Sequence, residues 1–456
     1  MLLPLAFCLG LITSSCFASS VRVVENSGVC ETTPGVYQAS GYVDLSPTQS
    51  IWFWFFAARN DPSNAPLSLW FNGGPGVSSM GGIVQEHGPC RITNDSSSLL
   101  LNPNSWNTRS NMLYIDQPIG AGFSKGDSNV TSSQEAAEDI WKFLQLWFED
   151  DKFKKYAEKP LALWTESFGG HFGSAFGAHF LKQNDAIDSG KTSGKKINLK
   201  VLGIGNGLID PLLQFPGYLQ YAGGENLYHP EGMVNKTTLA KATKAWNGTD
   251  DGCQSKIKAC YDTGTDDACE KAQTYCNKHV LKALYGPWDP YYIAHEEPDP
   301  YPPKANKFLN DASFKKQIGA EGNYTARSKT VGSNFKKTGD WMRNLRPDLE
   351  YVINSGVRTL LFDGDADFVF NYIGFENMVD GLQTKFLDES QSQEWTDYAV
   401  QGQITGKYKA AGGLSYLRVY GAGHKVAAYK YGNLGYGEAA LQFFNQITVG
   451  NGLQST

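Results

Sequence analysis

Short runs of bulky apolar and aromatic residues recur along the chain, separated by polar and glycine-rich segments. Runs of this kind are typical of β-strands, and we expect strands at 50–58, 66–71, 111–118, 160–165, 198–207, 358–367 and 414–424. Apolar residues at helical spacing predict a helix over 138–150, and two more helices are expected at 173–182 and 437–447. Strands that alternate with helices predict an α/β protein with a mostly parallel sheet covered on both faces.

The alternation of strands and helices stops between about 211 and 345. This stretch contains four cysteines and the proline-rich run "EEPDPYPP". We expect it to be an insertion, braced by disulfides, that covers the end of the sheet as a cap. The remaining ranges, 19–210 and 346–456, would then form one catalytic domain.

The first 20 residues are apolar and end in small residues, which predicts a secretory signal peptide over 1–18. The run is too short for a stable transmembrane helix. Because no Lys or Arg precedes it, a buried N-terminal strand is the alternative. The net charge of −6 argues against a nucleic-acid partner, and the chain has no polybasic patch that would favour a membrane surface.

Six cysteines remain once the signal segment is set aside, and an even number in an exported chain indicates disulfides. A zinc site is the alternative for the four that lie within 253–276, but no CxxC pair or histidine at ligand spacing supports it. We expect one bridge between Cys30 and Cys90. Two more bridges, with three possible connectivities, are expected among Cys253, Cys260, Cys269 and Cys276.

Five sequons for N-glycosylation accompany the signal segment and the paired cysteines. Together they predict an exported glycoprotein, modified at Asn94, Asn129, Asn235, Asn247 and Asn323. Motifs for other chemistries are missing: the chain has no P-loop lysine and no HExxH, and "GIGNGL" has Leu208 where a dinucleotide motif needs its third glycine. We therefore expect no metal and no cofactor.

The strand expected at 160–165 runs directly into Thr165-Glu166-Ser167-Phe168-Gly169 and then into a helical pattern. Strand, serine, glycine and helix in this order are typical of a nucleophile elbow, whose usual motif is G-x-S-x-G. Threonine replaces the first glycine, so an ordinary serine at the start of a helix is the alternative.

A serine hydroxyl needs a base to act as a nucleophile. In α/β-hydrolases the partners follow in the order Ser, Asp or Glu, His. His424 is the only histidine after residue 295, and it follows an expected strand. The acid would come from "LLFDGDADF", which offers Asp363, Asp365 and Asp367. His171 and His179, on the helix after the serine, fit packing roles better.

The segment "WFNGGPGVSS" (70–79) follows an expected strand, and its glycines let the backbone approach a ligand closely. An oxyanion hole needs backbone N–H donors at such a place. One donor would come from this loop and the other from Phe168, the residue after the serine. A plain tight turn is the alternative for the glycines.

Taken together, these segments resemble the serine carboxypeptidase family, whose members have the α/β-hydrolase fold. The resemblance extends from about residue 35 to 447. The aromatic residues and the "TESFGG" segment are most similar to those of fungal secreted members. It rests on "LWFNGGPGVSS", "EHGPCRI", "WNTRSNMLYIDQPIGAGFS" (106–124), "TESFGGHFG", "FDGDADFVFNYIG" and "GAGH". Val77 stands where the family has a cysteine, and Ala427 stands where it often has a proline.

The resemblance implies a role for each matching residue. Ser167 would be the nucleophile, Asp367 the orienting acid and His424 the base, with the amides of Gly74 and Phe168 as the oxyanion hole. The substrate's terminal carboxylate would be bound by Asn72, Gly73, Glu86 and Glu166. Glu86 and Glu166 would lie side by side and share a proton, and Lys425 would lie near the leaving residue.

The resulting expectation is an exported serine carboxypeptidase that removes single residues from peptide and protein C-termini and favours acidic pH. We expect an extracellular location, with the vacuole as the alternative. An acyltransferase or esterase could use the same triad, and a catalytically silent binding protein is the alternative from another class. The sequence indicates no oligomeric state.

Overall fold

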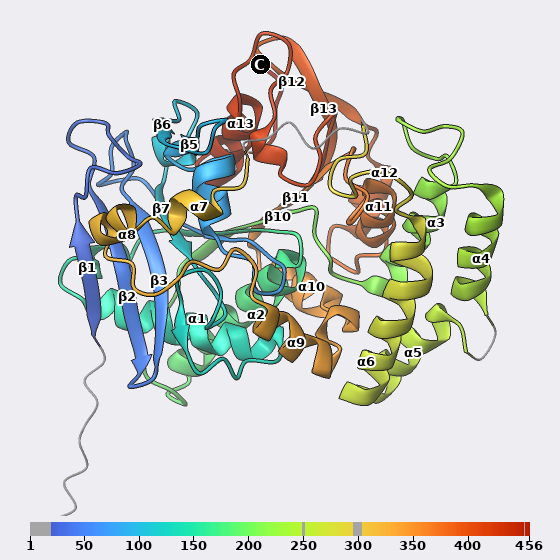
Figure 1. Ribbon diagram of the computed structural model, residues 1–456, viewed down its shortest axis with the longest axis horizontal. Helices are drawn as coiled ribbons and strands as arrows, with labels where there is room; N and C mark the ends of the chain where they lie inside the picture. Colours follow the sequence, from blue (N-terminus) through green and yellow to red (C-terminus); the bar gives the residue numbers. More distant parts are fainter. Residues whose placement is uncertain (1–19, 249–250, 295–302, 451) are drawn as a thin grey trace, which may run out of the picture.

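The computed structural model describes residues 20–248, 251–294, 303–450 and 452–456. A sheet of 12 strands runs through the molecule, with helices on both sides (Figure 1). The signal peptide expected at 1–18 lies outside the described residues. The strands are β1 (Val21–Glu25), β2 (Gln38–Ser46), β3 (Gln49–Phe56), β4 (Leu67–Phe71), β5 (Cys90–Ile92), β6 (Leu99–Leu101), β7 (Asn111–Ile115), β8 (Lys125–Gly126), β9 (Leu161–Glu166), β10 (Leu199–Gly205), β11 (Arg358–Gly364), β12 (Thr396–Val400), β13 (Gln403–Ala411) and β14 (Leu414–Val419).

The strand order of the large sheet is β1-β2-β3-β7-β4-β9-β10-β11-β14-β13-β12, and β8 pairs with β3. The six strands from β7 to β14 are parallel to their neighbours. The outer strands on both sides are antiparallel. The prediction of a mostly parallel sheet is thus confirmed. Because the carboxyl ends of parallel strands meet at one edge, the residues after β9, β10, β11 and β14 come together there.

Helices cover the two faces of the sheet, and alternate strand residues pack on each face. In β3, Phe53 and Phe55 face the side of α1, α2, α10 and α11, whereas Trp52 and Trp54 face the side of α7, α8 and α13. The helices are α1 (Ser133–Glu149), α2 (Gly169–Asp188), α3 (Pro211–Ala222), α4 (Lys236–Asn247), α5 (Cys253–Thr263), α6 (Asp266–Cys276), α7 (Asn306–Leu309), α8 (Ala312–Ile318), α9 (Lys329–Thr338), α10 (Arg346–Asn354), α11 (Tyr372–Asp380), α12 (Leu387–Ser392) and α13 (Glu438–Thr448).

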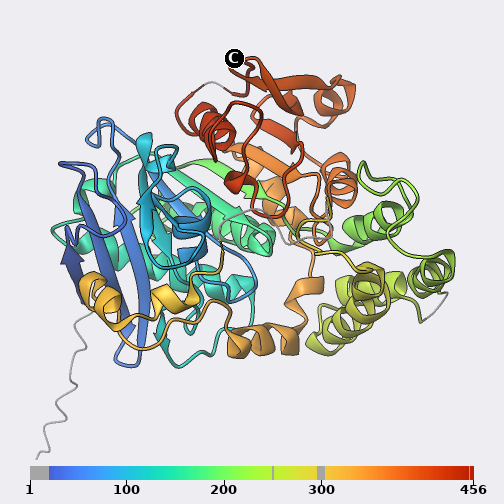
Figure 2. The same ribbon diagram turned by 45° about the horizontal axis from the view of Figure 1, so that its top comes forward.

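The range 211–345 is divided between two places in the fold (Figures 1 and 2). Helices α3 to α6 share a hydrophobic core of their own at one end of the molecule. Two disulfides, Cys253–Cys276 and Cys260–Cys269, both link α5 to α6. Helices α7 and α8 lie at the other end, where the Ser40 hydroxyl of β2 donates to the Ile318 carbonyl (2.7 Å).

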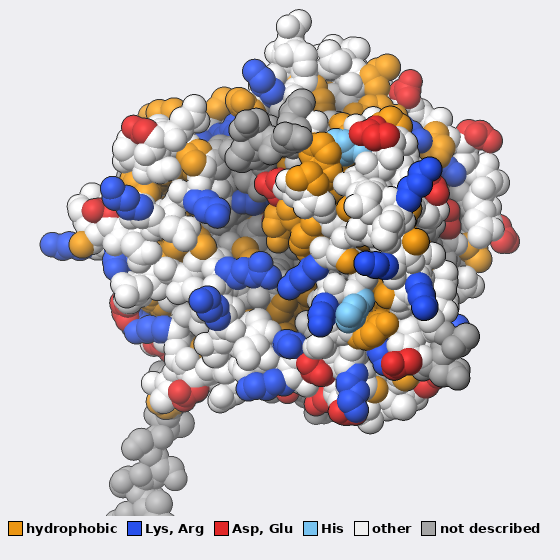
Figure 3. All heavy atoms as spheres, turned by 45° about the vertical axis from the view of Figure 1, so that its right-hand side comes forward, with side chains coloured by type: hydrophobic (Ala, Val, Ile, Leu, Met, Phe, Trp, Pro, Cys, Tyr) orange, Lys and Arg blue, Asp and Glu red, His pale blue; other side chains and the backbone are white. Residues whose placement is uncertain are grey.

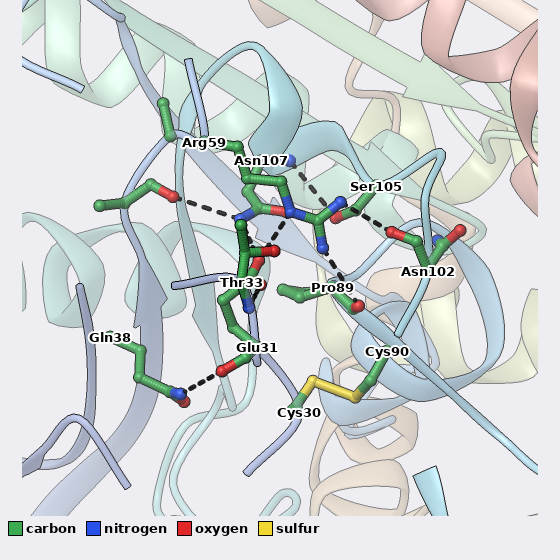
Figure 4. Close-up of polar contacts among 12 residues, drawn as sticks. Cys30, Glu31, Thr33, Gln38, Arg59, Pro89, Cys90, Asn102, Ser105 and Asn107 are labelled. Carbon is green, nitrogen blue, oxygen red and sulfur yellow. Dashed lines mark hydrogen bonds and ion pairs between the residues drawn. A yellow bond between two sulfur atoms is a disulfide. The ribbon is translucent and has the colours of Figure 1, made fainter. Parts of the chain in front are cut away.

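A buried polar cluster connects the loops next to the N-terminal strands β1 to β3 with the segment that follows Glu86 (Figure 4). Glu31 and Arg59 form an ion pair (Nε–Oε2, 2.9 Å) beside the Cys30–Cys90 disulfide, which is the bridge expected from the sequence. Burial acts to raise the pKa of Glu31, but hydrogen bonds outweigh it and lower that pKa below its ordinary value. Their further partners are Thr33, Pro89, Asn102 and Asn107.

The side chains expected to carry glycans lie at the surface. All five sequon asparagines, Asn94, Asn129, Asn235, Asn247 and Asn323, are exposed. Within the described ranges, every helix is too short or too polar to cross a bilayer.

Candidate active site

Ser167 occupies the turn between β9 and α2. Its φ of 68° lies in the left-handed region, which is uncommon for a residue other than glycine. The neighbouring strand fixes the turn, because the Ser167 N–H donates to the Gly205 carbonyl (2.9 Å) and the Ser167 carbonyl accepts from the Leu208 N–H (3.1 Å). The N-cap of α2 is Phe168, without a side-chain capping bond. The serine therefore has the geometry of a nucleophile elbow rather than of a helix cap.

His424 and Asp367 follow the neighbouring strands β14 and β11. His424 Nδ1 lies 2.7 Å from Asp367 Oδ2, and the other oxygen of this fully buried carboxylate accepts from the Val369 N–H (2.9 Å). The Tyr291 ring packs edge-on against the imidazole, and the Tyr291 carbonyl accepts from the His424 N–H (2.9 Å). Among the described residues the Ser167 hydroxyl makes no hydrogen bond to His424, although both line one cavity. Such bonds often form only when substrate is bound.

The other two aspartates of this segment have different partners. Asp363 Oδ1 accepts from Asn206 Nδ2 (2.8 Å), and Asp365 faces away from the imidazole, toward Tyr228. Burial raises the pKa of Asp363 well above its ordinary value, and the charge of Asp367 adds to the rise. Burial also raises the pKa of Asp365, to about 6. Asp367 is thus the one of the three aspartates that contacts the histidine.

The glycine-rich loop after β4 lies directly against the elbow. A Cβ on Gly73 would lie 2.4 Å from the Phe168 nitrogen, so only glycine fits there. Gly74 has a φ of 111°, which a side chain would strain. Neither the Gly74 N–H nor the Phe168 N–H is hydrogen-bonded to any other described residue. Two free amides therefore border the serine, which is the arrangement that an oxyanion hole requires.

Glu86 and Glu166 form a buried pair that Asn72 bridges. Asn72 Nδ2 donates to Glu86 Oε1 (3.2 Å) and to Glu166 Oε1 (2.5 Å). The amide is oriented by Trp70, whose indole N–H donates to Asn72 Oδ1 (2.8 Å). Burial raises the pKa of Glu166 well above its ordinary value and the nearby Glu86 raises it further, whereas Lys425 lowers it. The raised pKa favours a protonated Glu166, which could act as a donor at this position while both hydrogens of the Asn72 amide hold the two carboxyl groups.

A cavity of about 640 Å³ joins these groups. On the face drawn in Figure 3, a hollow with hydrophobic side chains inside it has Lys and Arg side chains along its border. Among the residues that the structure describes, no group of three or more His, Cys, Asp or Glu is arranged to hold a metal ion. The cavity is lined by Ser167, His424, Asn72, Gly73, Gly74 and Glu166, together with Tyr291, Trp341, Phe370 and the cations Lys304, Arg327 and Lys425.

Sequence analysis did not identify Asn206, whose side chain contacts Asp367. Its Nδ2 donates to Asp367 Oδ2 (2.9 Å) as well as to Asp363. The segment "GIGNGL" was weighed only as a dinucleotide motif. The position of Asn206 could have indicated its role, because it follows a parallel strand next to the strand that carries the serine.

Comparison with known proteins identifies the family. A family model described as serine carboxypeptidase matches residues 29–449. Carboxypeptidase S1 of Penicillium janthinellum is 38% identical over 436 residues, which cover 95% of this chain and 100% of that protein. Carboxypeptidase Y of Komagataella phaffii is 34% identical, with 89% of this chain and 75% of that protein covered.

A solved structure supports the same fold. Kex1(delta)p, described as a prohormone-processing carboxypeptidase from Saccharomyces cerevisiae, superposes with a TM-score of 0.71 at 24% identity, and the match covers 86% of this chain and 88% of that one. The expected α/β-hydrolase fold is therefore confirmed. With the family model and the relatives above, the chain belongs to the serine carboxypeptidase family.

Proposed function

We propose that the enzyme releases single residues from the C-termini of peptides and proteins through an acyl-enzyme formed on Ser167. This proposal rests mainly on which side chains line one cavity. Ser167 and His424 line it together with Glu166, a carboxyl that can donate to a carboxylate while protonated, and Asn72, which holds that carboxyl in place. A cavity that places a nucleophile near a carboxylate-binding group suits a substrate whose chain terminates there.

In the proposed mechanism, the Ser167 hydroxyl attacks the last peptide carbonyl while His424 accepts its proton and passes it to the leaving amino acid. Asp367 holds the imidazole through Nδ1 and stabilises its charged form. The amides of Gly74 and Phe168 would bind the oxyanion. Water then hydrolyses the acyl-enzyme by the same steps in reverse.

The carboxylate end explains the expected preference for acid. With the pKa of Glu166 raised by burial and by Glu86, the pair keeps a proton at low pH and can donate to the substrate's carboxylate beside the Gly73 amide, while Asn72 holds the two carboxyl groups. As the pH rises above that pKa, the pair becomes anionic and repels the same carboxylate. His424 must be neutral to act as a base, so activity on peptides should follow an acidic bell.

We also propose that the enzyme works in the secretory pathway, outside the cell rather than in the vacuole. Three disulfides and five exposed sequon asparagines support the secretory pathway, because both modifications belong to it, and recovery from the medium decides between the cell exterior and the vacuole. The test is expression in a eukaryotic host, with glycosidase treatment of the protein recovered from the medium. Recovery of an unglycosylated protein only from the cell interior would contradict it.

The test of the activity uses N-blocked dipeptides with a free C-terminal carboxylate, beside the matched amides and methyl esters. A carboxypeptidase should prefer the free acid at acidic pH, whereas an esterase or acyltransferase would prefer the ester and show no gain from the carboxylate. Labelling with a fluorophosphonate probe reports whether Ser167 is reactive. A protein that takes no label and binds the peptide unchanged would instead be a silent binding protein.

A further inference from the structure

The asparagine that follows β10 is in contact with both acidic side chains behind His424. Asn206 is fully buried, and its Nδ2 donates to Asp367 Oδ2 (2.9 Å) and to Asp363 Oδ1 (2.8 Å). Its Oδ1 accepts from the Gly364 N–H (3.2 Å). Because both N–H groups and the oxygen have partners, the amide is held in one orientation.

The backbone at this position is also constrained. Asn206 has a φ of 41°, in the left-handed region that asparagine tolerates better than most residues. Its N–H donates to the Phe362 carbonyl (2.8 Å), which is part of β11. The turn after β10 is therefore fixed to the strand that carries the two aspartates, and the amide cannot move independently of them.

We propose that Asn206 is a positioning residue whose amide holds the Asp367 carboxylate in the orientation that meets His424, with Asp363 as the anchor of that amide. This inference rests on the proposed roles of Ser167, Asp367 and His424. The torsion about the carboxylate of an aspartate is soft, because it joins a tetrahedral and a planar carbon. The Val369 N–H holds only Oδ1 of Asp367. Apart from His424, the group that holds Oδ2 is the Asn206 amide.

Asp363 can serve as an anchor without placing a second negative charge beside the imidazole. Burial and the charge of Asp367 both raise its pKa well above its ordinary value, which favours the neutral carboxyl, and a neutral carboxyl still accepts from an amide. The other titratable groups that interact with the two aspartates are Asp365, Glu376, Arg418 and Tyr416 near Asp363, and the phenols of Tyr218, Tyr221, Tyr285 and Tyr291 near Asp367.

Two variants test the role of the amide. Asn206→Gly keeps the left-handed backbone without strain and removes the side chain. We expect kcat per active site, counted with a fluorophosphonate probe at saturation, to fall by about 10- to 100-fold while KM for a blocked dipeptide changes little.

Asn206→Asp keeps the shape and tolerates the same backbone, but its carboxyl can donate only while protonated. Its kcat should therefore fall as the pH rises and this carboxyl loses its proton, in the opposite direction to the wild-type kcat. A residue with a merely structural role would not produce this inversion.

Asn111→Asp is the matched control, because Asn111 is also fully buried and its Nδ2 donates to the Ala65 carbonyl (3.0 Å), but it lies at the start of β7. This variant should lose thermal stability and keep the wild-type kcat and pH profile per active site. If the Asn206 variants behave in the same way, the positioning role is overturned. If wild type and Asn111→Asp also release no residue from the dipeptide, the proposed function fails instead.

Discussion

Two pairs of buried carboxyl groups stand at this site, and each is bridged by the amide of one asparagine. One pair lies behind the imidazole and does not line the cavity, whereas the other supplies Glu166 and the bridging Asn72 to the cavity wall. In each pair one carboxyl oxygen, Asp363 Oδ2 or Glu86 Oε2, has no hydrogen-bond partner among the described residues. The bridges run from Asn206 to Asp363 and Asp367, and from Asn72 to Glu86 and Glu166.

The difference between the pairs lies in what faces them. Two carboxylates in contact cannot both be charged at low cost when buried, so each pair favours one retained proton. Asp367 faces an imidazole that would become charged in the proposed mechanism, and its partner Asp363 does not line the cavity. Glu166 faces the space that a substrate would fill. The same local chemistry thus suits a fixed orienting group in one place and a pH-dependent donor in the other.

Replacing the acid of the first pair should have the largest effect. Asp367→Asn keeps the size of the side chain but favours the wrong tautomer of His424, so we expect kcat to fall by roughly 10⁴-fold. KM should change little, because Asp367 is not in the cavity. Steady-state kinetics on a blocked dipeptide measures both constants, with Ser167→Ala as the inactive reference. A loss confined to KM would contradict the division between the two pairs.

A change in the glycine-rich loop after β4 should have the second largest effect. Gly74 has a φ of 111°, and a Cβ there would lie 2.6 Å from the Val77 nitrogen. Gly74→Ala should displace the loop and its free amide, and we expect kcat to fall by about 100- to 1000-fold. Gly356→Ala is the control, because Gly356 has a φ of 88° with nothing within 4 Å of a Cβ. If both variants lose the same amount of melting temperature but only Gly74→Ala loses rate, the result supports the oxyanion role.

Much of the fold could be predicted because the central strands are buried on both faces and read as apolar runs. The outer strands β1, β2, β12 and β13 escaped prediction. In β12 and β13, one-sided burial leaves polar residues such as Asp397 and Lys407 in the pattern. The split of 211–345 was also missed, because sequence shows where an alternation stops and not where the chain then packs. The elbow and its histidine were found from order along the chain, whereas Asn206 carries no motif and required the strand neighbours.

Replacing the acid of the second pair should affect binding and its pH dependence. In wild type, KM for a free-carboxylate peptide should rise by up to about tenfold per pH unit above the raised pKa of Glu166, because the protonated donor becomes an anion. Glu166→Gln keeps a donor at every pH, so its KM should rise much less. The matched peptide amide should show no such difference between the two proteins. If wild type and Glu166→Gln give the same KM–pH curve for the free-carboxylate peptide, Glu166 does not bind the terminal carboxylate.

The smallest expected effect concerns Lys425, which is half-buried in the same cavity and whose Nζ donates to Gln85 Oε1 (2.8 Å). A cation beside the second pair should favour an acidic leaving residue, and Glu-ended and Gln-ended dipeptides differ in charge but hardly in shape. We expect the ratio of their kcat/KM values to fall by about 3- to 10-fold in Lys425→Met. Lys409→Met, at a half-buried lysine outside this cavity, should leave the ratio unchanged. If KM rises equally for both peptides in Lys425→Met, the ammonium acts on the terminal carboxylate itself, and the second pair is then not the only group that binds it.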